Sequence, residues 1–130
     1  KCVAYFNIER KDPVPESSRE GVGDWVFGCD VCQEVCPWNR FEKPARAMPP
    51  AKVPTEVPLD FLVESPNLRS YFKGLPVSRT MRRRMTRNAL LAMGNSGDEK
   101  WRPLLERHVK SQDAVISEQA AWSLARLGKC

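Results

Sequence analysis

The sequence predicts a mostly α-helical protein in which a cysteine-bearing segment is joined by a proline-rich connector to a helical domain. Three observations support this prediction. Four of the five cysteines lie within the first 36 residues, five prolines fall between positions 44 and 58, and apolar residues recur at helical spacing beyond them. The composition, with 42% hydrophobic and 28% charged residues, is that of a globular domain, and no apolar run approaches the roughly 20 residues of a membrane span.

The proline density divides the chain into residues 1–43, a connector over 44–58 and a helical domain over 59–130. Proline fixes φ and lacks an amide donor, so such a stretch favours an extended linker over a helix or a central strand. The 130 residues begin with Lys1 and show no signal peptide, so we expect a piece of a longer protein from the cytoplasm. In that reducing compartment, closely spaced cysteines indicate metal binding before disulfides.

Start and stop signals order the predicted helices. Residues 2–8 fit a helical turn or a short strand equally well, and the break at 12–15 precedes a helix over 16–20. Capping residues, Pro at the first helical position and terminal Gly define the others. These run from Ser65-Pro66 to Gly74, from Ser78 to Met93 with a stop over Gly94-Asn95-Ser96-Gly97, from the Asp98 cap onward, and from Ala114 to Leu127 with an end at Gly128.

Two of these helices match each other. Residues 89–94 (ALLAMG) align with residues 123–128 (SLARLG) at an offset of 34. Helix pairs that repeat at about this period stack into an α-solenoid, and the pattern resembles short HEAT-like repeats. The alternative is that any two amphipathic helices ending in Gly would align in this way.

The cysteine cluster indicates the chemistry of the first segment. Cys29-x₂-Cys32-x₃-Cys36-Pro37 reproduces the tail of the bacterial ferredoxin run, whose last cysteine ligates the other of two clusters. Two [4Fe–4S] clusters need eight thiolates and this chain offers four with Cys2, so it predicts the downstream half of a ferredoxin-like two-cluster iron–sulfur module. A structural zinc site and a redox-active dithiol are the alternatives. Cys130 is interpreted as a free thiol.

Positive charge gathers in the first part of the helical domain. Five arginines within nine residues have no acidic neighbour between them: Arg79, Arg82, Arg83, Arg84 and Arg87. On one helix, Arg79, Arg83 and Arg87 would share a face, where phosphate oxygens would relieve their mutual repulsion. The alternative interpretation is a solvated helix face. Four tryptophans complete the list of candidates, with Trp25 and Trp38 expected to shield a cluster and Trp101 and Trp122 expected in the core.

Three stretches together resemble one known family. They are Cys2-Val3-Ala4-Tyr5-Phe6-Asn7-Ile8-Glu9, the run from Val26 through Gly28-Cys29 to Pro37-Trp38-Asn39, and Arg87-Asn88 followed by Ala92-Met93-Gly94-Asn95. They look like the C-terminal half of tRNA epoxyqueuosine reductases. Such enzymes use cobalamin and two [4Fe–4S] clusters to reduce epoxyqueuosine to queuosine at the tRNA wobble position, the last step of queuosine biosynthesis.

The resemblance implies a role for each candidate residue. Cys2, Cys29 and Cys32 would bind one cluster and Cys36 the other, while Ala4, Gly28 and Cys29 would lie near the cobalamin. No catalytic residue is assigned, because the family's catalytic acid and cobalamin domain lie upstream. The residues that would bind the anticodon region of tRNA are Arg79, Arg82, Arg83, Arg84, Arg87 and Asn88.

The resemblance also implies partners. We expect an electron donor protein, no membrane and a monomer. The alternative function is a ferredoxin-like electron-transfer module fused to a protein-binding helical repeat, with no RNA involved. A binding-only zinc module is the third hypothesis.

Overall fold

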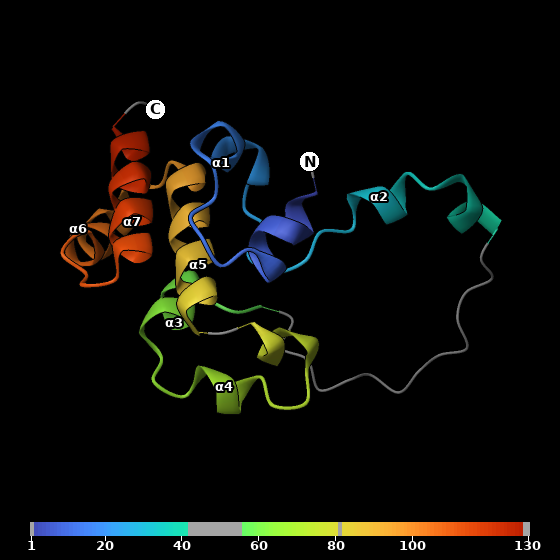
Figure 1. Ribbon diagram of the computed structural model, residues 1–130, viewed down its shortest axis with the longest axis horizontal. Helices are drawn as coiled ribbons and strands as arrows, with labels where there is room; N and C mark the ends of the chain where they lie inside the picture. The colour runs from blue at the N-terminus through green and yellow to red at the C-terminus, as the bar shows by residue number, and fades with distance from the viewer. Residues whose placement is uncertain (1, 42–55, 81, 129–130) are drawn as a thin grey trace.

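The computed structural model describes residues 2–41, 56–80 and 82–128, and the prediction of a mostly helical protein is confirmed (Figure 1). No strand occurs within these ranges, and none of their helices has the length and apolarity needed to cross a bilayer. The elements in chain order are η1 (Tyr5–Glu9), α1 (Glu16–Val22), α2 (Val31–Glu34), η2 (Pro37–Phe41), α3 (Leu59–Glu64), α4 (Leu68–Tyr71), η3 (Pro76–Arg79), α5 (Arg82–Ser96), η4 (Glu99–Trp101), α6 (Arg102–Val109) and α7 (Ala114–Leu127).

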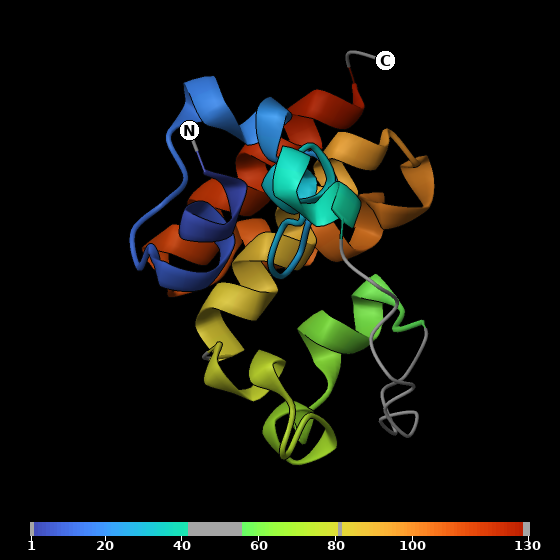
Figure 2. The same cartoon turned by 90° about the vertical axis from the view of Figure 1, so that its right-hand side faces the viewer.

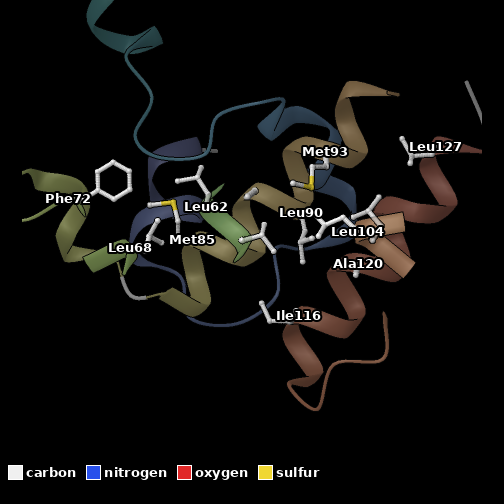
Figure 3. Packing of buried hydrophobic residues seen from close by; sticks show 13 residues of the cluster. Leu62, Leu68, Phe72, Met85, Leu90, Met93, Leu104, Ile116, Ala120 and Leu127 are labelled. Carbon is white, nitrogen blue, oxygen red and sulfur yellow. The ribbon is translucent and has the colours of Figure 1, made fainter. Parts of the chain in front are cut away.

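Helix α5 is the centre of the molecule. It packs against α7 on one side and α3 on another, and α6 packs against α7 (Figure 1). The main hydrophobic cluster fills the space between these helices (Figure 3). Its members include Leu62, Met85, Leu90, Leu105 and Ile116, all 6% exposed or less. Trp101 packs against this cluster while remaining partly exposed, so the prediction that it is a core residue is confirmed only in part.

Helix α7 follows the sequence prediction closely. Its first amides are capped by the Asp113 carboxylate, which accepts from the main-chain N–H groups of Val115 and Ile116. Its buried residues recur at helical spacing, with Ile116, Ala120 and Leu127 facing the core. The helix ends before Gly128, as predicted.

Two predicted helix starts, at Ser78 and at Ser65, are wrong. Helix α5 begins at Arg82, because Pro76–Arg79 forms a separate 3₁₀ turn, and it continues through Gly94 to Ser96. The chain turns at Gly97, whose φ of 67° is readily adopted only by glycine. Ser65 likewise does not start a helix, because it ends α3. The proline that follows Ser65 disfavours a helical conformation there, and the next helix begins only at Leu68.

The first segment packs onto the helical domain. A second cluster joins Phe6, Val14 and Val22 to Leu91 of α5, and Trp122 of α7 packs against it. Residues before and after the predicted connector therefore share one interface, although 42–55 lie outside the described residues. The part that carries α2 and η2 stands away from the packed helices, and Figure 2 views it end-on.

Candidate functional site

A compact turn presents two of the predicted ligand cysteines. Cys32 lies on α2, and Cys36 follows within one further turn, where its N–H donates to the Gln33 carbonyl at 3.2 Å. Asn39 closes the turn, since its amide donates to the Gln33 main-chain oxygen at 2.7 Å. The Cys-Pro-Trp-Asn motif therefore shapes the turn that follows Cys36, because Pro37 begins η2 and Asn39 ties η2 back to α2.

The thiols are available for coordination. All four predicted ligand cysteines are free, with Cys2 and Cys32 exposed and Cys29 and Cys36 half-buried. Within the described ranges, however, no three His, Cys, Asp or Glu side chains are grouped so that they could hold a metal ion. The structure thus presents the predicted ligands separately and does not bring Cys2, Cys29 and Cys32 together as one site.

Four large apolar side chains that lie near these cysteines in the sequence are exposed to solvent. Val31, Val35 and Trp38 are 49%, 68% and 81% exposed, and Trp25 is 36% exposed. The cluster-shielding role predicted for Trp25 and Trp38 stays a prediction.

A buried asparagine joins the two halves of the motif-bearing segment. Asn7, 1% exposed, donates to the Gly28 carbonyl at 2.8 Å and accepts from the Gly28 N–H at 3.1 Å. It therefore holds η1, which begins just after Ala4, against the residue that precedes Cys29. Gly28 has a φ of 73°, and a Cβ there would meet nothing within 4 Å, so the backbone faces open space. The sequence analysis missed Asn7, whose only signal was a polar residue within the apolar run Val3–Ile8.

The predicted tRNA contacts Arg87 and Asn88 are buried, and this corrects the sequence interpretation. Arg87 is 0% exposed, and its guanidinium donates to the main-chain oxygens of Phe6, Arg10 and Asp12 at 2.6–2.9 Å. Asn88, 2% exposed, accepts from Arg87 and donates to the Asn7 carbonyl at 2.7 Å. Both side chains tie the first segment to α5, so neither offers a surface for nucleic acid.

The electrostatics of Arg87 reflect this burial. Removal from water lowers the pKa of Arg87 to about 10, and the neighbouring cations Arg84, Arg10 and Arg83 act in the same direction while Asp12 opposes them. The guanidinium remains charged at neutral pH. Its hydrogen bonds run from a buried cation to neutral oxygens, and no carboxylate among the described residues pairs with it.

The other arginines of the run do not share one face. Arg79 belongs to η3, and Arg83 pairs with Asp113 at the start of α7. Arg82 donates to the Ser65 and Val63 carbonyls, and Arg84 donates to the Glu9 carbonyl at 3.3 Å. The run is thus not a continuous unneutralised stripe, because the turn before Arg82 breaks the helical register. Arg79 and Arg82 remain exposed without an acidic partner within the described residues.

The Arg83–Asp113 pair predicts a specific response to acid. The hydrogen bond from Arg83 lowers the pKa of Asp113, and the two helix N–H groups lower it further while burial raises it. A carboxylate with a lowered folded-state pKa stabilises the fold above its unfolded-state pKa of about 3.9, and this contribution is lost as pH falls through the folded value. Asp113→Asn keeps a good helix cap and should therefore flatten the stability profile below about pH 4.

Urea unfolding of both proteins between pH 2 and 6 checks this expectation. Asp113→Ala serves as the companion variant, because it also removes the cap and should lose about 1 kcal/mol even at neutral pH. An acid limb of equal slope in the original protein and in Asp113→Asn would contradict the assignment.

Comparisons with known proteins show which families the chain resembles. Residues 1–39 match the family described as a 4Fe-4S double cluster binding domain. The chain is 34% identical to an epoxyqueuosine reductase of Xanthomonas campestris pv. campestris over 98% of its own length and 38% of that protein's. The chain therefore spans just over a third of this relative, less than the half expected from the sequence resemblance.

Solved structures agree. Selenomethionine-labelled epoxyqueuosine reductase superposes with a TM-score of 0.83 at 26% identity, over 97% of this chain and 35% of that one. An epoxyqueuosine reductase solved with an epoxyqueuosine-modified tRNA stem loop has the same fold, with a TM-score of 0.71 at 24% identity over 98% of this chain and 35% of that one. Sequence and fold thus confirm the resemblance: the chain is similar, along nearly all of its length, to about a third of the length of the epoxyqueuosine reductases, and its residues 1–39 match the double-cluster binding family.

Proposed function

We propose that this chain is part of an epoxyqueuosine reductase, an oxidoreductase that reduces epoxyqueuosine to queuosine at the wobble position of tRNA. The observation that carries the proposal is the match of residues 1–39 to a double-cluster domain within a chain-long similarity to these reductases. In this proposal the first segment serves electron delivery, and the helical domain serves tRNA docking.

The cysteines fit iron–sulfur clusters by their chemistry. Four free thiols with partial exposure form the donor set, and thiolates are the usual protein ligands of [4Fe–4S] clusters. Cys2, Cys29 and Cys32 would contribute to one cluster and Cys36 to the other, with the remaining thiolates supplied from elsewhere in the protein. Bound clusters supply one-electron transfer, and the turn fixed by Asn39 sets how Cys32 and Cys36 are presented.

Cobalamin would lie near Ala4, Gly28 and Cys29. The support for this is the Asn7 amide, which holds the start of the first segment against Gly28, and the open space beside the Gly28 backbone. Small residues allow a large planar ligand to approach the main chain closely. In the proposed enzyme, the cobalamin supplies the reductive chemistry at the epoxide.

The helical domain would dock tRNA in the anticodon region. Helices α5 and α7, which carry the matching sequence motifs, pack side by side, and this supports a HEAT-like arrangement. The exposed Arg79 and Arg82 and the half-buried Arg84 supply cations at the start of α5. Guanidinium groups bind phosphate oxygens by paired hydrogen bonds, which makes them suited to a nucleic-acid backbone.

Metal analysis tests the proposal. After anaerobic reconstitution at its natural length, the protein should hold about eight irons and eight sulfides, the content of two [4Fe–4S] clusters. Cys36→Ser should lower the iron content by about four, because it removes a ligand of one cluster only. Cys130→Ser is the matched control and should leave the iron content unchanged. Stoichiometric zinc without sulfide would defeat the redox assignment.

A further inference from the structure

Two neighbouring hollows lie between α4, η3 and the start of α5. One has a volume of about 690 Å³ and the other about 570 Å³. Arg69 of α4 and Ser78 of η3 line both, so the two hollows adjoin, and together they are called the α4–η3–α5 depression. Figure 1 shows α4 below the start of α5.

Four cations lie among the apolar and neutral residues that line the depression. Arg79 and Arg82 line the larger hollow, Lys73 lines the smaller one, and Arg69 lines both. Neither lining contains an acidic residue, and none of these four cations forms an ion pair within the described parts of the chain. Neighbouring cations repel each other where no carboxylate lies between them, and an anionic ligand lowers that repulsion.

Two other groups of basic residues on the surface lie beside carboxylates. A third hollow, against α6, is lined by three basic residues, but three acidic residues, Asp60, Glu64 and Glu106, line it as well. Next to Arg82 on α5, Arg83 is paired with Asp113, and these three residues line a further hollow. The α4–η3–α5 depression differs from these two hollows because no acidic residue lines it.

Two polar groups show that the larger hollow is a built site. Thr80, 7% exposed, lines it, and its buried hydroxyl has no hydrogen-bond partner among the residues that the structure describes. An unpaired buried hydroxyl costs free energy that a ligand oxygen would recover. Arg82 is held in place by the Val63 carbonyl at 3.2 Å and by the Ser65 carbonyl, so its position is fixed before any ligand arrives.

We propose that this depression binds consecutive phosphates of an RNA backbone, with Arg69 and Lys73 as contacts that lie outside the arginine run. Two adjoining hollows that share Arg69 fit a repeating anion better than a single one. The inference rests on the proposed function and deepens it, because it moves the docking surface from the exposed face of α5 to the groove between α4 and α5.

Fluorescence anisotropy with a tRNA anticodon stem loop tests the site. The protein is used at its natural length with its clusters reconstituted, and affinity is measured at several salt concentrations. The double variant Arg69→Gln/Lys73→Gln should bind about tenfold more weakly, and the slope of log K against log salt should fall by about 1.5, because two phosphate contacts are lost.

The matched control removes equal charge elsewhere. Lys100→Gln/Arg102→Gln alters exposed cations that pair with Asp98 and Glu99, and should leave both affinity and slope almost unchanged. If the original protein binds the stem loop and the two double variants behave alike, the site is wrong while tRNA docking stands. If the original protein does not bind the stem loop at any salt concentration, the proposed docking function itself fails, and the site with it.

Discussion

Replacing Arg87 with methionine should destabilise the protein by about 3 kcal/mol, although the substitution removes a buried charge. The guanidinium donates to three main-chain carbonyls of the first segment and to Asn88, and each hydrogen bond from a charged donor is worth about 1.5–3 kcal/mol. Relief of charge burial, which lowers the pKa of Arg87 to about 10, offsets part of that loss. The net effect is a loss, since Met has no donor for the three carbonyls, of which that of Phe6 lies in a buried position.

Urea unfolding at neutral pH measures the change, and hydrogen exchange locates it. Amides of the segment 5–12 should lose protection first, because the Phe6, Arg10 and Asp12 carbonyls are the groups that Arg87 anchors. Arg79→Met is the control, as an exposed residue of η3, and should change stability by less than about 0.5 kcal/mol. Equal unfolding midpoints for the Arg87 and Arg79 variants would show that the anchor carries no stability.

The arginine run shows where sequence reasoning stops. Helical spacing groups residues that would share a face of one continuous helix, but Arg79 lies on the separate turn η3, and spacing does not show which face a distant segment covers. Arg87 is buried because the first segment, about 80 residues earlier, packs on it, and no local pattern encodes that contact. Arg69 and Lys73 were missed for the converse reason, because the fold brings isolated cations beside the run.

The cysteine motif behaved differently. Its meaning depends on local chemistry and spacing, so Cys29-x₂-Cys32-x₃-Cys36-Pro37 predicted the family match over 1–39 without knowledge of the fold. What the motif leaves open is how the ligands gather, since Cys2 lies on a separate element from Cys32 and the described residues hold no three-ligand group. The helical elements were likewise predictable from caps and periodicity, as α7 shows.

Gly94 was expected at the end of a helix, but it lies inside one. Its motif aligns with the one that ends at Gly128, and both glycines were predicted to end helices. Gly128 does follow the end of α7, but Gly94 lies inside α5 and is fully covered. A Cβ on Gly94 would stand 2.7 Å from the Cα of Ser123 and 2.6 Å from its Cβ. Glycine is needed there because α5 and α7 cross at that point.

Gly94→Ala should therefore destabilise the protein by about 3 kcal/mol. The sign is informative, because alanine is the better helix former by about 1 kcal/mol and would stabilise a helix with no neighbour. The clash involves main-chain atoms of a fully buried residue, so no side-chain rotation relieves it, and the two helices must separate. Separation also stretches the hydrogen bond from the Ser123 hydroxyl to the Leu90 carbonyl, now 2.8 Å.

Gly21→Ala provides the matched control on α1. Gly21 is exposed within that helix, and a Cβ there would meet nothing within 4 Å. The same substitution should then stabilise the protein by about 0.5–1 kcal/mol, through helix propensity and a less flexible unfolded chain. Urea unfolding of the two variants side by side measures both signs. Gly94→Ala could stabilise the protein, as Gly21→Ala is expected to, only if α5 and α7 did not cross at Ser123. That result would remove the side-by-side packing of α5 and α7, which is the support for the proposed HEAT-like arrangement.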